Sequence, residues 1–134
     1  MVGNPDSHSL AIRVYYEDTD MGGIVYYANY LRYIERARSD WVRGLGIDQR
    51  KLKDEEGLVF AVRRVEADYL APACLDDELT VETDVRKISG ARLVLNQGVR
   101  RGETLLFQAI VTVVMISQSG HPARLPANIR LLRR

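Results

Sequence analysis

The apolar positions of the chain predict one long helix among segments that are otherwise strand-like. From Tyr26 or Tyr27 to Arg43, apolar residues recur at spacings of three and four, which places them on one face of a helix. They are Tyr30, Leu31, Ile34, Ala37, Trp41, Val42 and Leu45. Gly44 and Gly46 follow at the place where a glycine commonly ends a helix. No other segment keeps this period over a comparable length, so we expect a single long helix.

The other periodic segments alternate apolar and polar residues, as strands with one buried face do. They cover residues 10–16, 57–70, 78–85, 92–100 and 105–116. In the second of these segments the apolar positions change parity at Arg63-Arg64, which predicts a bulge or bend. Ser89-Gly90 predicts a two-residue hairpin turn.

This order of elements predicts an α+β fold in which one antiparallel sheet wraps around one helix. At 134 residues the chain has the length of one domain, so we take residues 1–134 as one unit. We expect residues 1–8 to form a loose arm, residues 48–56 a short helical turn or loop, and residues 118–134 an irregular tail. Residues 105–116 are apolar on both faces. Because the helix covers only one of these faces, self-association is expected to cover the other.

Composition excludes several classes of protein. The formal net charge is +1, whereas nucleic-acid-binding domains are usually strongly basic, so we expect no nucleic-acid partner. No apolar run reaches the ~18 residues that span a bilayer. Residues 1–9 have neither the basic nor the apolar region of a secretory signal, which favours a cytoplasmic protein. Cys74 is the only cysteine, which rules out an internal disulfide and a multi-cysteine zinc site.

Candidate chemistry lies between the first strand and the helix. Asp18 and Asp20 are followed by Gly22 and Gly23, so that a carboxylate stands on a flexible turn just before a helix N-terminus. That end of a helix presents unpaired backbone N–H groups and the positive end of the helix dipole. Such a site can polarise a carbonyl oxygen while the carboxylate acts on its carbon. The simpler interpretation is that Asp20 forms the turn or caps the helix, since aspartate favours both positions.

Other chemistries fit the chain poorly. A calcium loop of the EF-hand type would need different side chains at Gly22 and Asn29. An aspartyl-phosphate enzyme would need a larger, parallel α/β fold. There is no G-x-S-x-G motif, and both histidines, His8 and His121, lie in terminal segments, which argues against a Ser-His-Asp triad. Cys74 is more typical of a small packed side chain than of a catalytic thiolate.

A family resemblance rests on the run from Val14 to Tyr26, Val-Tyr-Tyr-Glu-Asp-Thr-Asp-Met-Gly-Gly-Ile-Val-Tyr, followed by Asn29-Tyr30-Leu31 and Glu35-Arg36-Ala37-Arg38. These motifs resemble the acyl-CoA thioesterases of the hotdog fold, most of all the branch associated with the Tol-Pal envelope system within the 4-hydroxybenzoyl-CoA thioesterase family. Weaker matches are Tyr69 to Ala73, Leu75 to Asp77 and Arg124 to Pro126. The resemblance implies a helix wrapped by a five-stranded antiparallel sheet. It also implies dimers, often tetramers, with active sites at the subunit interface and edge pairing through residues 57–70.

The resemblance assigns roles to individual residues. It implies that Asp20 is the catalytic carboxylate and that the backbone N–H of Tyr27 holds the thioester carbonyl, at a position where many members carry histidine. We expect the substrate to contact four residues of this region: Asp18, Gly23, Tyr33 and Glu35. The alternatives are that Asp18 only forms the turn, that Tyr33 belongs to the core, and that Glu35 is a solvated charge or an ion-pair partner of a neighbouring arginine. We expect four cations to contact the coenzyme A phosphates, because arginine and lysine are the usual phosphate ligands: Arg86, Lys87, Arg92 and Arg124. Scattered surface charge is the alternative interpretation of these cations.

The expected activity is hydrolysis of an acyl-CoA thioester to a free acid and coenzyme A, with Asp20 as a nucleophile or as the general base for a water molecule. No metal or redox cofactor is implied, and coenzyme A enters only as part of the substrate. The expected partners are acyl-CoA, further copies of the chain and an acyl carrier protein. The alternative is a non-catalytic hotdog protein that binds an acyl thioester, an acyl carrier protein or an envelope component.

Overall fold

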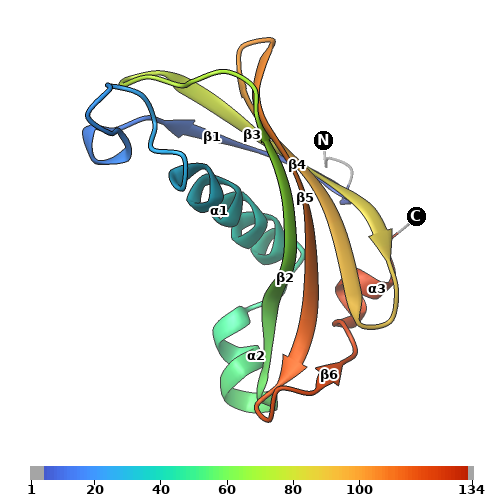
Figure 1. Ribbon diagram of the computed structural model, residues 1–134. Helices are drawn as coiled ribbons and strands as arrows, with labels where there is room; N and C mark the ends of the chain where they lie inside the picture. Colours follow the sequence, from blue (N-terminus) through green and yellow to red (C-terminus); the bar gives the residue numbers. More distant parts are fainter. Residues whose placement is uncertain (1–4, 133–134) are drawn as a thin grey trace.

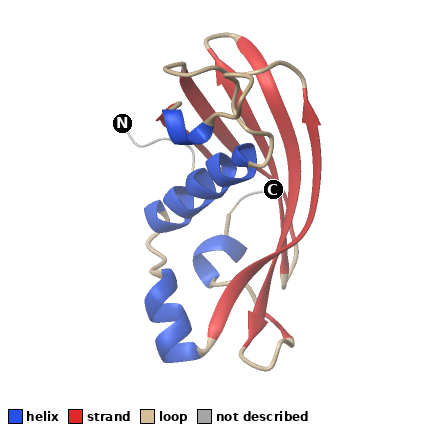
Figure 2. Cartoon of the chain, turned by 60° about the vertical axis from the view of Figure 1, so that its left-hand side comes forward, coloured by secondary structure: helices blue, strands red, loops and turns tan. Residues whose placement is uncertain are grey.

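One antiparallel sheet curves around the long helix α1 (Asn29–Gly44), which lies on its concave side (Figures 1 and 2). The computed structural model describes residues 5–132. The five long strands are β1 (Ser7–Arg13), β2 (Leu58–Tyr69), β3 (Glu78–Ile88), β4 (Arg92–Arg101) and β5 (Thr104–Ser117). They lie side by side in the order β1-β3-β4-β5-β2, and the short β6 (Pro122–Ala123) pairs with β5. This arrangement confirms the expected α+β architecture.

Helix α1 begins slightly later than the apolar period indicates. Residues 26–28 form a turn, because the Asn29 amide donates to the Tyr26 carbonyl at 2.8 Å. Leu31, expected on the buried face, is 41% exposed, and Tyr33 is buried in its place. The buried face packs against β1, β3 and β4 through Tyr30, Tyr33, Ile34, Ala37, Trp41 and Val42. Gly46 follows the helix at φ +87°, a left-handed conformation that glycine adopts at little cost.

Both chain ends are more regular than the sequence indicates. Ser7 and His8, expected in a loose arm, are the first residues of β1 and pair with β3. β1 ends at Arg13, because the following residues turn into the short 3₁₀ helix η1 (Tyr16–Asp18). The expected irregular tail contains β6 and helix α3 (Ala127–Arg130), whose Asn128 amide donates to the Leu45 carbonyl at 2.7 Å. Residues 1–4 and 133–134 lie outside the described part of the chain.

β2 is an edge strand, and it carries the predicted bulge. Its register with β5 shifts between Val62 and Arg64, which confirms the parity change seen in the sequence. Every residue from Val62 to Tyr69 is exposed. The charged segment before β2 forms helix α2 (Gln49–Glu56). The Asp48 carboxylate caps this helix by accepting hydrogen bonds from two backbone amides in its first turn.

Strand β5 lies between β4 and the edge strand β2. One of its faces is buried, through Phe107, Ala109, Val111, Val113 and Met115. The other face is only half-buried in the described chain, and it carries the apolar residues Ile110, Val114 and Ile116. The strand is therefore apolar on both faces, as expected, and its second face keeps part of its apolar surface exposed.

A polar network crosses the core between α1 and the sheet. Gln97 of β4 is fully buried, and its amide donates to the Thr83 hydroxyl at 2.8 Å and to the Ile34 carbonyl at 3.0 Å. The Gln97 oxygen accepts a hydrogen bond from the Arg38 guanidinium at 2.9 Å. Burial lowers the pKa of Arg38. Because buried polar groups need hydrogen-bond partners, this network favours one packing position of α1 against β4.

Candidate functional site

Asp20 stands on a tight turn between η1 and α1. In this segment, the Asp20 turn (residues 19–25), the Asp20 amide donates to the Ile24 carbonyl at 2.9 Å. The loop between Asp20 and Ile24 ends at Gly23. The φ angle of Gly23 is +79°, which residues with a side chain rarely adopt. Asp20 Oδ1 accepts a hydrogen bond from the Gly22 amide at 2.9 Å. The side chain is exposed, and Oδ2 has no hydrogen-bond partner among the described residues, so one carboxylate oxygen is available to a substrate.

Asp18 lies two residues earlier and is only 5% exposed. Its Oδ2 accepts a hydrogen bond from the Tyr15 amide at 2.8 Å, and its Oδ1 accepts one from the Asn29 side chain at 2.7 Å. These bonds tie η1 to the first residue of α1. The carboxylate is buried and both of its oxygens are occupied, which favours a structural role for Asp18. A contact between Asp18 and the substrate stays a prediction.

Tyr33 is fully buried next to Asp18, which favours the core interpretation of this side chain. Its contact with the substrate stays a prediction. Its hydroxyl has no hydrogen-bond partner within the described residues. Burial, and then the negative charge of Asp18, raise the pKa of this hydroxyl. Tyr33 therefore belongs to the core beneath the Asp20 turn.

The backbone amide of Tyr27 lies at the open N-terminus of α1. Ala28 holds the capping position without a side-chain hydrogen bond, and the Tyr27 N–H has no acceptor among residues 5–132. The Tyr27 carbonyl accepts a hydrogen bond from the Tyr69 hydroxyl at 3.0 Å. The Tyr69 and Tyr30 rings each lie 5.0 Å from the Phe107 ring, centroid to centroid. An aromatic cluster thus holds the backbone at Tyr27 while its N–H remains unpaired.

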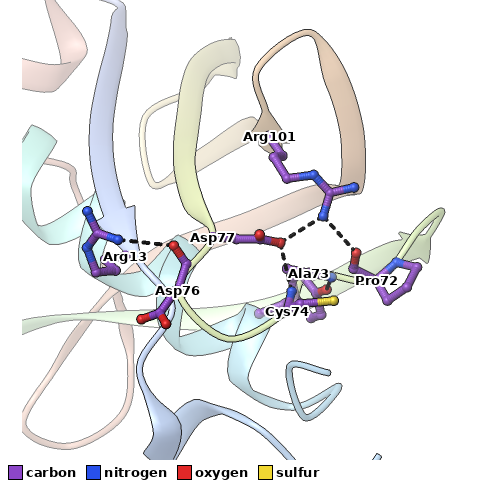
Figure 3. Close-up of polar contacts among 8 residues, drawn as sticks. Arg13, Pro72, Ala73, Cys74, Asp76, Asp77 and Arg101 are labelled. Carbon is purple, nitrogen blue, oxygen red and sulfur yellow. Dashed lines mark hydrogen bonds and ion pairs between the residues drawn. The ribbon is translucent and has the colours of Figure 1, made fainter. Parts of the chain in front are cut away.

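The loop between β2 and β3 supports the Asp20 turn, and Figure 3 shows part of it. We call residues 70–77 the bracing loop. The Val25 amide of the turn donates to the Ala73 carbonyl at 2.8 Å, and Ile24 forms an antiparallel bridge with Cys74. The Ala73 amide donates to the Tyr30 hydroxyl of α1 at 3.0 Å. The turn, the loop and the helix are therefore joined around one buried residue, Ala73.

Arg101, the last residue of β4, holds the bracing loop from the side of the sheet (Figure 3). Its Nη1 donates to the Asp77 carboxylate at 2.8 Å and to the Pro72 carbonyl at 3.2 Å. The same Asp77 oxygen accepts a hydrogen bond from the Cys74 amide at 2.8 Å. The Cys74 amide, and then Arg101, lower the pKa of Asp77, which therefore stays ionised in this setting.

Glu35 lines a groove between α1 and β2. Its Oε2 accepts a hydrogen bond from the Ser39 hydroxyl at 2.6 Å. The Glu35 side chain, Arg38 and Val62 border a cavity of about 160 Å³. The same three residues border a second, neighbouring cavity, which extends to Leu31. Leu31 lies about one helical turn after Tyr27. The groove thus runs along α1 from its N-terminal end, and a substrate contact at Glu35 stays a prediction.

The four cations expected on coenzyme A gather at one end of the sheet. Three flank the turn between β3 and β4, and the fourth lies beside that turn, because the Leu125 amide donates to the Gly90 carbonyl at 2.8 Å. All are exposed, and together they form the basic cluster: Arg86, Lys87, Arg92 and Arg124. The stretch of β3 from Leu79 to Arg86, roughly 23 Å at the rise of a strand, separates them from the end of the sheet that carries the Asp20 turn (Figure 1). One chain therefore does not bring the basic cluster to Asp20.

Sequence reasoning missed four residues that hold the site: Asn29, Tyr69, Asp77 and Arg101. Asn29, Tyr69 and Asp77 lie inside matched motifs, where a polar group with no assigned chemistry was the available signal. Arg101 lies in no matched motif, and its partner Asp77 is 24 positions away, which no local pattern reveals. The described part of the chain contains no group of three or more His, Cys, Asp or Glu side chains that could hold a metal ion. None of its helices is long and apolar enough to cross a membrane.

Known proteins resemble this chain in both sequence and structure. Residues 22–108 match the thioesterase superfamily. The acyl-CoA thioesterase YbgC of Haemophilus influenzae is 44% identical over 108 residues, which cover 81% of this chain and 79% of that protein. A probable thioesterase from Bartonella henselae superposes with a TM-score of 0.86 at 39% identity, over 90% of this chain and 99% of that one. A mutant 4-hydroxybenzoyl-CoA thioesterase, solved with 4-hydroxybenzoyl-CoA, has a TM-score of 0.86 at 25% identity. The match covers 96% of this chain and 99% of that one.

Proposed function

The chain belongs to the thioesterase superfamily, and from this premise we propose that it hydrolyses acyl-CoA thioesters to a free acid and coenzyme A. The observation that carries the proposal is the exposed Asp20 carboxylate on a tight turn beside an uncapped helix N-terminus. The Haemophilus relative, named an acyl-CoA thioesterase, and the neighbour solved with 4-hydroxybenzoyl-CoA support the choice of substrate class. Because one fold can host several functions, the mechanism depends on the residues of the site itself.

We assign the thioester carbonyl oxygen to the unpaired N–H of Tyr27. Negative charge develops on this oxygen when a tetrahedral intermediate forms, and a fixed N–H at the positive end of a helix dipole stabilises that charge. The hydrogen bond from Tyr69 to the Tyr27 carbonyl restrains the backbone before the substrate arrives. Because only a backbone group is used, tyrosine can stand where many relatives of this branch carry histidine.

Asp20 acts on the carbonyl carbon by one of two routes. As a general base, it takes a proton from water as the water oxygen bonds to the carbon, the C–S bond then breaks, and the departing thiolate takes up a proton. As a nucleophile, Oδ2 bonds to the carbon and displaces coenzyme A, and water hydrolyses the resulting mixed anhydride. Both routes use the free Oδ2 while the Gly22 amide orients Oδ1. Neither route requires a redox cofactor.

We place the acyl group in the groove between α1 and β2, since this groove reaches Leu31 near Tyr27. The basic cluster lies too far from Asp20 to hold the same substrate within one chain. We therefore propose a homodimer or homotetramer in which the basic cluster of one subunit binds the coenzyme A phosphates beside Asp20 of another. The exposed edge of β2 and the half-buried face of β5 are the surfaces that support this assembly.

The test is coenzyme A release from a panel of acyl-CoAs by the wild-type protein and by Asp20→Asn. Asparagine keeps the size and the turn-forming ability of the side chain, so the fold should be retained. Loss of a general base alone costs ~10²–10⁴-fold, so kcat should fall at least about 10²-fold on the best substrate. KM should change little, because the Tyr27 N–H and the groove are untouched.

Glu17→Gln is the matched control, because it neutralises another exposed carboxylate three residues from Asp20. It should keep the wild-type kcat, and thermal melts should show that both variants are folded. A wild-type protein that releases no thiol from any acyl-CoA would be a binding protein instead. If Asp20→Asn melts like the wild type and keeps more than about a third of its kcat, Asp20 is only a turn residue.

A further inference from the structure

The Asp20 turn depends on one distant segment for its position. Beyond its neighbours η1 and α1, its backbone pairs with the bracing loop alone among the described residues, through Val25 with Ala73 and Ile24 with Cys74. The Asp20 amide in turn donates to the Ile24 carbonyl. A displacement of Ala73 and Cys74 would therefore move Ile24, and Asp20 with it.

Ala73 is held from two sides. Its amide donates to the Tyr30 hydroxyl of α1 at 3.0 Å, and its side chain is completely buried. The next amide, that of Cys74, donates to the Asp77 carboxylate at 2.8 Å. Helix α1 thus fixes one side of this backbone, and Asp77 fixes the other.

Arg101 connects this arrangement to the sheet. Its Nη1 bonds to Pro72 and to Asp77, which precede and follow Ala73 in the chain. The Arg101 and Asp77 side chains are 41% and 23% exposed, and partly exposed ion pairs of this kind add little to overall stability. A charge-assisted bond still fixes geometry, because its donor stands at the end of an ordered strand. Loop placement is therefore the main effect of this pair.

We infer that Arg101 and Asp77 are positioning residues for Asp20, acting through Ala73 and Cys74. The inference rests on the proposed thioesterase function and adds two residues that touch no reacting atom. Catalytic groups must be held within ~0.5 Å of their productive positions. A misplacement of about 1 Å can cost ~10²-fold in rate, so a loosened loop is expected to lower turnover without changing the substrate contacts.

The activity test compares Arg101→Met and Asp77→Asn with the wild-type protein. Methionine removes both guanidinium hydrogen bonds while keeping much of the side-chain length, and asparagine removes the charge of Asp77. Each variant should lower kcat by about tenfold and leave KM for acyl-CoA within about twofold, because the groove and the Tyr27 N–H are unchanged. Arg101→Lys keeps a cationic donor for Asp77 and should recover most of the lost kcat.

The matched control is Glu78→Gln, next to the same loop. Glu78 pairs with Arg13 at 2.8 Å, and Arg13 also donates to the Asp76 carbonyl at 3.1 Å (Figure 3). This pair is similar in length to that of Arg101 and Asp77, but it makes no contact with Ala73 or Cys74. Glu78→Gln should therefore keep the wild-type kcat. A loss equal to that of Asp77→Asn would overturn the inference.

Amide hydrogen exchange tests the same inference without a substrate. In Arg101→Met and Asp77→Asn, the Val25 amide should exchange about tenfold faster or more, while the buried Val81 amide of β3 keeps its wild-type rate. Unchanged exchange at Val25, or equal acceleration at Val25 and Val81, would overturn the inference. If the wild-type protein hydrolyses no acyl-CoA, the proposed function fails, and exchange at Val25 still decides whether the pair holds the turn.

Discussion

Asp18 and Asp20 lie two residues apart in the chain and have opposite environments. Asp18 is buried, and its oxygens accept hydrogen bonds from Tyr15 and Asn29. Asp20 is exposed, and one of its oxygens is unpaired among the described residues. The short helix η1 ends at Asp18, so the chain turns outward before Asp20. We therefore expect one carboxylate to serve stability and the other to serve activity.

Asp18→Ala should lower the free energy of unfolding by about 2–4 kcal/mol, because the buried Asn29 amide loses its acceptor at ~1–3 kcal/mol and the partly buried Tyr15 amide loses its own at ~1 kcal/mol. Asp20→Ala should leave the free energy of unfolding near the wild-type value, since its carboxylate is exposed and bonded only to the Gly22 amide. Urea unfolding of both variants measures this difference. Equal stabilities would show that the buried carboxylate does not hold η1 to α1.

At the same scale, the sequence predicted Asp20 as the reactive carboxylate but did not indicate which residues hold its turn. Asp20 was identified because its turn, glycines and helix start are adjacent in the chain. Asp77 and Arg101 are 24 residues apart and meet only after β3 and β4 have paired. The burial of Asp18 was not predicted, because burial at a turn depends on the loop and helix packed around it.

Tyr69 links two elements, because its hydroxyl on β2 donates to the carbonyl just before α1. Tyr69→Phe keeps the ring packed on Phe107 and removes only this hydrogen bond. A bond worth about 1 kcal/mol corresponds to about a fivefold change in rate, so kcat should fall by roughly that factor with little change in melting temperature. Steady-state kinetics on one acyl-CoA measure the effect.

Tyr26→Phe is the control, because its ring is exposed and its hydroxyl has no partner among the described residues. Tyr26→Phe should keep the wild-type kcat. If Tyr69→Phe also keeps the wild-type kcat, the Tyr27 amide does not need the hydrogen bond from Tyr69 to hold its position.

At the element scale, periodicity was enough for the long helix, the five long strands and the bulge in β2. It misplaced the start of α1 because Asn29 bonds back to Tyr26 in a turn that the apolar period cannot distinguish from a helix. It missed β6 and α3 because such short elements are held by distant partners, such as the Leu45 carbonyl that accepts from Asn128. Local patterns thus predict the elements whose apolar positions repeat with a helix or strand period. The short elements without such a repeat form because of tertiary contacts.

The whole molecule has surfaces that a single chain leaves uncovered. The outer edge of β2 is exposed from Val62 to Tyr69, and the second face of β5 is half-buried. We predict a dimer or a tetramer at micromolar concentration, measured by sedimentation velocity. A stable monomer would contradict both this prediction and the placement of one subunit's basic cluster beside another subunit's Asp20.

The basic cluster gives a second prediction at this scale. If its cations hold the coenzyme A phosphates, the KM for acyl-CoA should rise with salt, because exposed charge pairs are screened. A pantetheine thioester, which lacks the nucleotide phosphates, should show much less salt dependence. Arg92→Gln should weaken the effect for acyl-CoA only. Equal salt dependence for both substrates would mean that the cluster is ordinary surface charge.

The bulge in β2 restricts which assemblies this edge of the sheet can enter. A regular strand of 12 residues could pair with other copies in several registers, and copies could continue to add as they do in amyloid. The shift between Val62 and Arg64 interrupts the regular strand at one point, and a bulge of this kind blunts a sheet edge against open-ended pairing. The bulge therefore favours a closed dimer or tetramer rather than the open-ended addition of further copies. We expect a chain without the bulge to aggregate before its turnover falls.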